Sequence, residues 1–238
     1  TPNSQPLDDT DYLGFYHGYT YSSNQDKANK KIIDHFTLNI KRENNNIIAE
    51  YHGTVSKYYG RPVIINHSNQ TDCPSVEIPL TNEQGRTITL SFVYHKYKSN
   101  PTMYFRIGTI TTSTTSEPSC VMIRNFALFR KEVHNIDTYL RGMLKMTGSH
   151  FTIQKSVMDM YKGDPFISEF CNKYSEEKGD VLVIIEDAFF SRLSYIEESK
   201  KEALISIMLK LKSHALEPDY ILQRHGHNNL ADFAKTKL

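Results

Sequence analysis

The sequence predicts an α+β protein in which an antiparallel β-barrel of about eight strands is followed by a smaller α/β domain. The first observation is a run rich in glycine and aromatic residues, Tyr12 to Tyr21, in which Gly14 and Gly18 are four residues apart. The second is a period-two alternation of apolar and polar residues, with a turn signal about every ten residues, as far as Lys131. The third is a change to helical spacing beyond that residue.

The strands are expected in chain order. The run Tyr12 to Tyr21 is too aromatic and glycine-rich for a helix, and it predicts a strand that bends where the side chain is missing. The next strand, 33–40, places Phe36, Leu38 and Ile40 on one face. The remaining expected strands are shorter runs bounded by turn residues: 47–56, 63–65, 76–80, 87–94, 103–109 and 121–129. Their even cadence is typical of a meander rather than of βαβ units.

Beyond residue 133 helical and strand patterns alternate. The expected elements are helices at 136–146, 165–174 and 199–216, a last helix from residue 230, and strands at 150–157 and 181–185. The run Val181 to Ile185 is continuously apolar, which is typical of a strand buried on both faces. We therefore divide the chain into a disordered lead at 1–10, a ligand-binding β-barrel domain at 11–132 and an α/β domain at 133–238.

The charge balance gives no support to duplex DNA as a partner. Lys and Arg total 28 against 27 for Asp and Glu, a net charge of +1, whereas such proteins usually carry a basic excess. The three cysteines, Cys73, Cys120 and Cys171, are far apart and odd in number, so reduced thiols of a cytoplasmic protein are expected.

No apolar run approaches the roughly 20 residues of a transmembrane helix. Because the chain begins at Thr1 without a methionine, we expect a fragment or a processed form. A preceding membrane anchor, which would place the protein at the cytoplasmic face of a membrane, or a DNA-binding head stays open.

The Gly14-x-Tyr16 element resembles the Gly-x-Trp motif with which lipocalins and other calycins begin their first barrel strand. In that family the aromatic ring closes one end of the barrel, and an Arg from the last strand packs over it. The resemblance implies that Arg130 lies over Tyr16 in a cation–π contact worth about 0.5–2 kcal/mol. Tyr in place of Trp is a departure from the family. The alternative is that the chain forms another antiparallel barrel or sandwich in which Gly-x-Tyr occurs by chance.

A second resemblance covers residues 11–131. The order of its motifs resembles that of lipocalin-like sensor barrels in bacterial regulatory and anti-phage defence proteins. These motifs are the opening Gly-x-Tyr element, the Phe105 to Gly108 element, the Thr/Ser-Pro loop that follows it, and the closing Leu128 to Lys131. Some of these barrels are attached to helix-turn-helix or TIR segments. Others form the C-terminal domain of membrane-anchored effectors in cyclic-oligonucleotide signalling. The resemblance implies a small nucleotide-like second messenger as the ligand.

The candidate ligand-binding residues are polar-tipped or cationic side chains within apolar strands: Tyr16, Tyr51, Tyr94, Tyr104, Arg106 and Arg124. A barrel of about eight strands has room inside for one small ligand or for a plug of side chains. Aromatic faces could stack a base, and Arg could bind phosphate through two hydrogen bonds. The alternative is that the tyrosines face solvent or ring the barrel rim. Gly14, Tyr16 and Arg130 are the expected closure residues.

Two carboxylates suggest a different function. Glu186 and Asp187 follow the apolar strand 181–185, where α/β enzymes place metal or catalytic groups. With other acidic residues they could hold Mg²⁺ in a nuclease or phosphodiesterase; these are Asp159, Asp164 and Asp180. A turn that caps a helix is the favoured interpretation.

Other polar elements point to no cofactor or metal. His225-Gly226-His227 lacks a third metal ligand. The basic residues of the late helices are interrupted by acidic ones; they are Arg192, Lys200, Lys201, Lys210 and Lys212. We therefore expect a bacterial sensor or effector module rather than an enzyme, with a small-molecule partner. A protein-interaction module, including a homo-oligomer, is the third hypothesis.

Overall fold

The computed structural model describes residues 12–22, 32–67, 70–93, 105–113, 120–133, 138–193 and 195–224. The chain divides into two units, one that ends at Val133 and resumes at Leu222, and one from His134 to Ile221. The lead predicted at 1–10 and the helix predicted from residue 230 lie outside the described residues.

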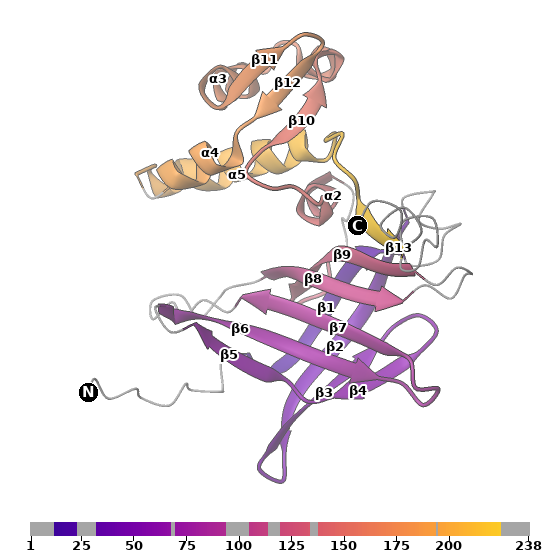
Figure 1. Ribbon diagram of the computed structural model, residues 1–238. Helices are drawn as coiled ribbons and strands as arrows, with labels where there is room; N and C mark the ends of the chain where they lie inside the picture. The colour runs from indigo at the N-terminus through magenta and orange to yellow at the C-terminus, as the bar shows by residue number, and fades with distance from the viewer. Residues whose placement is uncertain are drawn as a thin grey trace, which may run out of the picture. The chain divides into compact units, whose positions relative to one another are not determined.

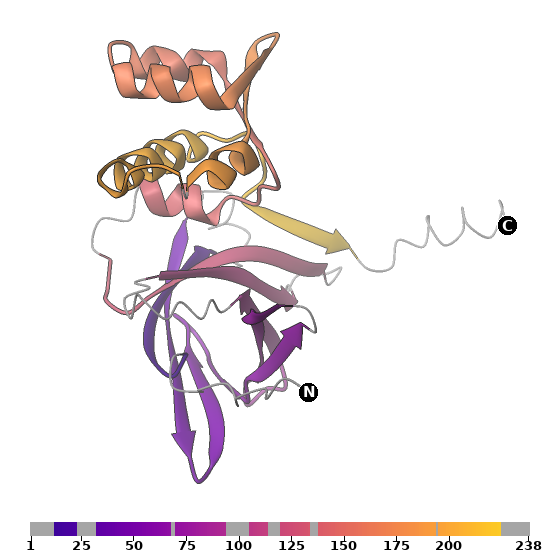
Figure 2. The same cartoon turned by 90° about the vertical axis from the view of Figure 1, so that its left-hand side faces the viewer.

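Eight strands of the first unit form a closed antiparallel ring (Figures 1 and 2). In ring order they are β1 (Gly14–Tyr21), β2 (Ile33–Glu43), β3 (Asn46–His52), β4 (Lys57–Gly60), β6 (Gln70–Thr81), β7 (Thr87–Val93), β8 (Phe105–Ser113) and β9 (Cys120–Phe129). The ring closes because β1 pairs with both β2 and β9: Gly18 lies opposite Phe36 on one side and Leu128 on the other. The predicted antiparallel barrel of about eight strands is confirmed.

Two further strands extend the ring. Within the described chain, β5 (Val63–His67) pairs with β6 alone, and β13 (Tyr220–Arg224) lies beside β9. A turn at a run of asparagines joins β2 to β3 (Figure 1), and Asn44 and Asn45 adopt φ values of 47° and 67° there. Asparagine tolerates this left-handed conformation, which two-residue hairpin turns require.

The second unit combines a small antiparallel sheet with helices. Its elements are α2 (Thr138–Leu144), β10 (Phe151–Gln154), the 3₁₀ helix η2 (Lys155–Tyr161), α3 (Pro165–Tyr174), β11 (Ser175–Lys178), β12 (Val181–Ile184), α4 (Glu186–Leu193) and α5 (Glu198–Lys212). The sheet order is β10-β12-β11. The unit has a hydrophobic core of its own, which includes Phe151, Phe170 and Phe189. None of the described helices is long and apolar enough to cross a lipid bilayer.

Three sequence expectations for this unit are corrected. The strand predicted at 150–157 ends at Gln154, and η2 takes up its second half. The run Val181 to Ile185 is not buried on both faces, because burial alternates along β12 and the sheet is antiparallel. The hairpin β11–β12 was not predicted; Gly179, with φ 61°, allows its turn. Helix α4 begins at Glu186, where a turn that caps a helix was the favoured interpretation.

Candidate ligand site in the barrel

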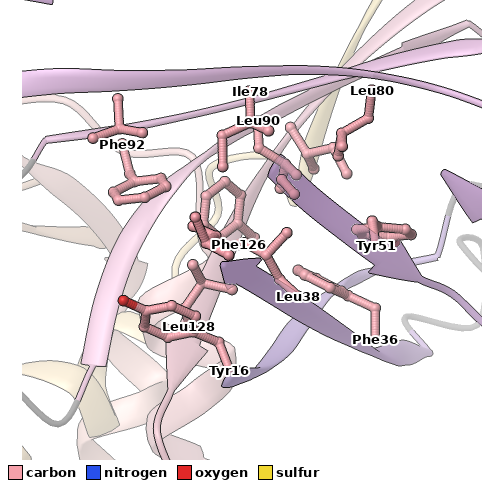
Figure 3. Close-up of a cluster of buried hydrophobic side chains, with 14 of the residues drawn as sticks. Tyr16, Phe36, Leu38, Tyr51, Ile78, Leu80, Leu90, Phe92, Phe126 and Leu128 are labelled. Atoms are coloured by element: carbon pink, nitrogen blue, oxygen red, sulfur yellow. The ribbon is translucent and has the colours of Figure 1, made fainter. Parts of the chain in front are cut away.

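The interior of the barrel is lined by side chains that alternate inward along each strand. On β9 the even-numbered residues from Met122 to Leu128 point inward, because Phe126 and Leu128 belong to the buried core. Figure 3 shows these two side chains with core side chains of other strands, all directed into one interior. The inward position Arg124 is therefore a buried cation on a strand face that is otherwise apolar.

A row of aromatic rings crosses this interior. Phe36 lies 4.6 Å from Tyr51 and 6.3 Å from Phe126, and Phe126 lies 6.2 Å from Phe92, between ring centroids. Gly18 makes room for the row, since a Cβ atom there would lie 2.2 Å from the ring of Phe36. The central level of the barrel is thus filled by side chains, so a ligand must bind nearer to one end.

Arg124 is the unusual residue of the barrel interior. Its side chain is 3% exposed. One guanidinium nitrogen, Nη1, donates to the backbone oxygen of Tyr21, whereas Nε–H has no acceptor among the described residues. Burial lowers the pKa of the guanidinium, and the electrostatic influence of Tyr51 and Asp34 opposes that shift. Because Arg stays protonated in proteins, the structure holds a buried positive charge with an unused donor.

Thr112 adds a second unused donor on the neighbouring strand. Its side chain is buried, and its hydroxyl has no hydrogen-bond partner in the described structure. In the β8–β9 ladder Ile110 pairs with Arg124 and Thr112 pairs with Met122, so Thr112 and Arg124 are diagonal neighbours. Both point inward, since Ile110, two residues before Thr112, belongs to the core.

Two tyrosines face Arg124 from other strands. Tyr51 and Tyr58 are paired across β3 and β4, and their rings meet edge to face with centroids 5.7 Å apart. Burial raises the pKa of Tyr51, and the charge of Arg124 opposes the shift. The Tyr51 hydroxyl therefore stays a neutral donor at physiological pH.

These residues lie near the end of the barrel where β1 finishes and β4 begins. The loops that join β3 to β4 and β6 to β7 are at this end. A hollow of about 180 Å³ lies between these two loops; it is lined by Val55, Ser56, Lys57, Asn82, Glu83 and Gln84. The hollow lies at the same end of the barrel as Arg124, although Arg124 is not among the residues that line it.

The opposite end is closed by three residues that the sequence singles out. The guanidinium carbon of Arg130 lies 4.1 Å from the ring centroid of Tyr16. Gly14 has φ 128°, and a Cβ atom there would lie 2.1 Å from Nη1 of Arg130. The Tyr16 hydroxyl donates to the backbone oxygen of Tyr12 at 2.7 Å. The face of the Tyr16 ring is therefore in contact with Arg130, and its hydroxyl is bonded to the backbone of Tyr12.

The remaining predicted ligand residues are only partly placed. Tyr94 and Tyr104 lie outside the described residues. Arg106 is on β8 opposite Leu128, and its side chain is likewise outside what is described. Of the six predicted ligand residues, the structure thus brings Tyr51 and Arg124 together.

Sequence reasoning missed Thr112, Tyr58 and Asp34. The alternation of Ile110 and Thr112 continues the inward face of β8, but the polar run that begins at Thr111 suggests a loop, and the predicted strand stops at residue 109. Tyr58 is on β4, which is separated from β3 by the Gly53–Ser56 turn, and this turn falls inside the strand predicted at 47–56.

Three of the five candidate magnesium ligands of the second unit make structural contacts, and the other two, Asp180 and Asp187, are exposed. Glu186 is 5% exposed and accepts from Lys212 at 2.8 Å and from Thr147 at 2.7 Å. Asp164 caps α3 through the backbone N–H groups of its first turn, and Asp159 pairs with a surface lysine. No group of three or more metal-ligating side chains occurs in the described chain. This arrangement does not favour the magnesium site.

The second unit also contains the element order of a helix-turn-helix. η2 and α3 are joined by a three-residue turn that contains Gly163, with φ 94°. The exposed charged residues from η2 to the hairpin are five acidic ones and three basic ones: Asp159, Glu169, Glu176, Glu177 and Asp180 against Lys162, Lys173 and Lys178. This surface repels phosphate, so it does not favour nucleic-acid binding. In the basic set of the late helices, Lys212 is buried against Glu186 and Lys200 pairs with Glu197.

The chain was compared with known protein families, curated proteins and solved structures, and none of them matches it.

Proposed function

We propose that the barrel of the first unit binds a small nucleotide-like ligand at the end that contains Arg124. The observation that carries this proposal is the buried guanidinium with an unused Nε–H. A buried charge is costly unless a partner compensates it. No carboxylate of the described chain forms an ion pair with Arg124; its one hydrogen bond there goes to a backbone oxygen. An anionic group of a ligand supplies the missing partner.

The surroundings of Arg124 suit the rest of a nucleotide. Tyr51 and Tyr58 offer aromatic surface, and stacking of a base on such a ring is worth about 1–3 kcal/mol. The hollow between the β3–β4 and β6–β7 loops lies at the same end of the barrel. The closed ring of eight strands and the contact of Arg130 with Tyr16 support the lipocalin-like architecture. On this architecture a ligand enters at the end away from Arg130.

The role that follows is that of a sensor. A ligand that binds between the loops stabilises one arrangement of them, and so shifts the population of conformations. The ligand class we propose is the nucleotide second messengers of bacterial regulation and anti-phage defence, in line with the resemblance of residues 11–131.

A thermal-shift experiment tests the proposal. The full chain is heated with cyclic mono-, di- and trinucleotides, and a ligand at 100 times its dissociation constant is expected to stabilise the fold by about 2.7 kcal/mol. The shift should disappear in Arg124→Met, which fills a similar volume without a charge. Arg130→Met is the matched control, because Arg130 lies at the closed end, and it should keep the shift.

Absence of a shift with every nucleotide would contradict the nucleotide part of the proposal. A shift that survives Arg124→Met would contradict the location of the site.

A further inference from the structure

We infer that the barrel takes a ligand with one singly charged oxyanion group, and that Arg124 and Thr112 hold this group together. The inference rests on the proposed ligand-binding function and adds to it the charge of the ligand and a second binding residue. Thr112 is not among the residues that the sequence analysis selects.

The two unpaired donors lie on adjacent strands, and both side chains face the interior of the barrel. Arg124 and Thr112 are diagonal neighbours on β9 and β8, at a separation of about 7–8 Å, within reach of a long side chain. Both side chains are buried, and the Nε–H of Arg124 and the hydroxyl of Thr112 are the unpaired donors. A carboxylate or a phosphodiester has two free oxygens, so one oxygen can accept from each donor.

The local charges limit the ligand to a single negative charge. Among the described buried residues of the first unit, Arg124 is the one cation. Asp34, whose charge acts on Arg124, already provides a nearby negative charge. A second charge on the ligand would lie close to Asp34 and without a second buried cation among the described side chains of the first unit, which is strongly unfavourable in a buried site.

The neighbours of the two donors suit a neutral body on the ligand. Ile110, Met122 and Phe36 are buried core or near-core residues of the same interior. A cyclic mononucleotide, with one phosphodiester charge and a flat base, has this chemistry. An aromatic carboxylate also has one oxyanion group and a flat apolar body. The experiment therefore distinguishes a cyclic mononucleotide from an aromatic carboxylate.

The test is calorimetric titration of the full chain at neutral pH with ligands that differ in charge. Cyclic AMP carries one charge, AMP and cyclic di-AMP carry about two, and adenosine carries none. Naphthoate and naphthamide form the corresponding carboxylate and neutral pair. We expect cyclic AMP or naphthoate to bind at least about tenfold more tightly than its doubly charged or neutral counterparts.

Variants at Thr112 test the second donor. Thr112→Val keeps the shape of the side chain and should weaken the bound monoanion about tenfold, whereas Thr112→Ser keeps the hydroxyl and should bind as the wild type does. Thr111→Val is the matched control, because Thr111 is the adjacent residue of β8 and points the opposite way. Circular dichroism establishes that each variant is folded.

The outcomes distinguish the inference from the proposed function. If cyclic di-AMP or AMP binds as tightly as cyclic AMP, or Thr112→Val binds normally, the inference is wrong and the nucleotide-binding function stands. If naphthoate alone binds, the single charge is supported and the nucleotide is not. If no compound binds, both are overturned.

Discussion

Arg130 stacks its guanidinium on the face of the Tyr16 ring at the closed end of the barrel. Its guanidinium carbon lies 4.1 Å from the centroid of Tyr16, and Gly14 leaves the space that the guanidinium occupies. Tyr suits this contact, because a phenol ring presents a negative face to a cation. Its hydroxyl adds a hydrogen bond to the backbone of Tyr12.

The contact between Arg130 and Tyr16 should contribute measurably to stability. We expect Arg130→Met to lower the free energy of unfolding by about 0.5–2 kcal/mol, since Met keeps an apolar chain but loses the cation–π attraction. Urea unfolding of Arg130→Met, Tyr16→Leu and the double variant measures the coupling. Lys131→Met, at the exposed neighbouring residue, is the control. A coupling energy near zero would show that the contact is not stabilising.

His35 is a titratable residue of β2, and its side chain is on the outer face of the barrel. Its Nε2 lies 3.2 Å from Nδ1 of His17, and its ring lies 5.0 Å from that of Tyr19. Desolvation by burial, followed by the charge of His17, lowers the pKa of His35, while Glu132 acts in the opposite direction. The folded state therefore binds fewer protons than the unfolded state at mildly acidic pH.

Stability should fall as the pH drops below the unfolded pKa of histidine, about 6.5. Because the pKa of His35 is lower in the folded state, its contribution is complete above that pH and is lost below it. His35→Gln should reduce this loss; some loss should stay, since burial also lowers the pKa of His214. Urea unfolding between about pH 7.5 and 5.5 measures the effect. His52→Gln, at an exposed position of β3, is the control. An unchanged pH dependence in His35→Gln would contradict the assignment.

At the scale of elements, the glycines of β1 make room for side chains of other strands. Gly14 accommodates Arg130, and Gly18 accommodates the ring of Phe36. This explains why the opening run combines glycines with aromatic residues: on the same strand Tyr16 points into the core between the two glycines.

The fit of Gly18 against Phe36 can be tested by a pair of substitutions. Gly18→Ala should destabilise the fold by about 1–3 kcal/mol, because a Cβ atom would overlap the ring of Phe36. Phe36→Leu should cost less in the Gly18→Ala background than in the wild type. Gly148→Ala, where no atom lies within 4 Å of a Cβ atom, is the control. Thermal unfolding followed by circular dichroism measures these changes, and independent, additive effects would refute the fit.

Helix α3 and strand β10 show where local sequence signals suffice. Asp164 and Pro165 begin α3 at the predicted residue, because the carboxylate accepts from two backbone N–H groups and proline suits the first turn. The strand after His150 was predicted too long, since Val157 and Met158 continue an apolar pattern that does not separate strand from 3₁₀ helix. Tertiary packing of η2 on the core decides this case.

For the molecule as a whole, each of the two units has its own core. In the second unit Phe170 is 1% exposed, whereas Phe166, one turn earlier on α3, is 68% exposed. Gly142 on α2 lets α5 approach closely, because a Cβ atom there would lie 2.3 Å from the backbone oxygen of Leu209. Lys145 is buried in an ion pair with Asp219 at 2.8 Å.

We expect residues 134–221 alone to fold and to unfold in one cooperative transition. The reason is that the side chains of this core come from within these residues. Phe170→Ala should destabilise the fragment by about 3–5 kcal/mol, and Phe166→Ala, the matched exposed phenylalanine, should have a small effect. Chemical denaturation followed by circular dichroism measures both. A fragment without a cooperative transition would show that this unit depends on the rest of the chain.

Part of the candidate site could be predicted from the sequence and part could not. Arg124 and Tyr51 stand out as polar-tipped residues in apolar strands, and the alternation of each strand directs them inward. That they face one another, and that Thr112 is beside Arg124, depends on the register of β8 against β9 and on closure of the ring. Register is a pairing of distant segments, and no local pattern specifies it.

The resemblance of the opening motif to that of lipocalins predicted the contact of Arg130 with Tyr16. The sequence by itself predicted most strands of the barrel and their inward faces, although not β4. These follow from alternation, glycine and turn chemistry, which act over a few neighbouring residues. Only the tertiary structure decided that the interior is crossed by aromatic rings, that Arg124 keeps an unpaired donor, and that Glu186 is neutralised by Lys212. The physical reason is that burial and partner choice depend on which segments meet in space, and distant residues with similar local patterns can meet in many ways.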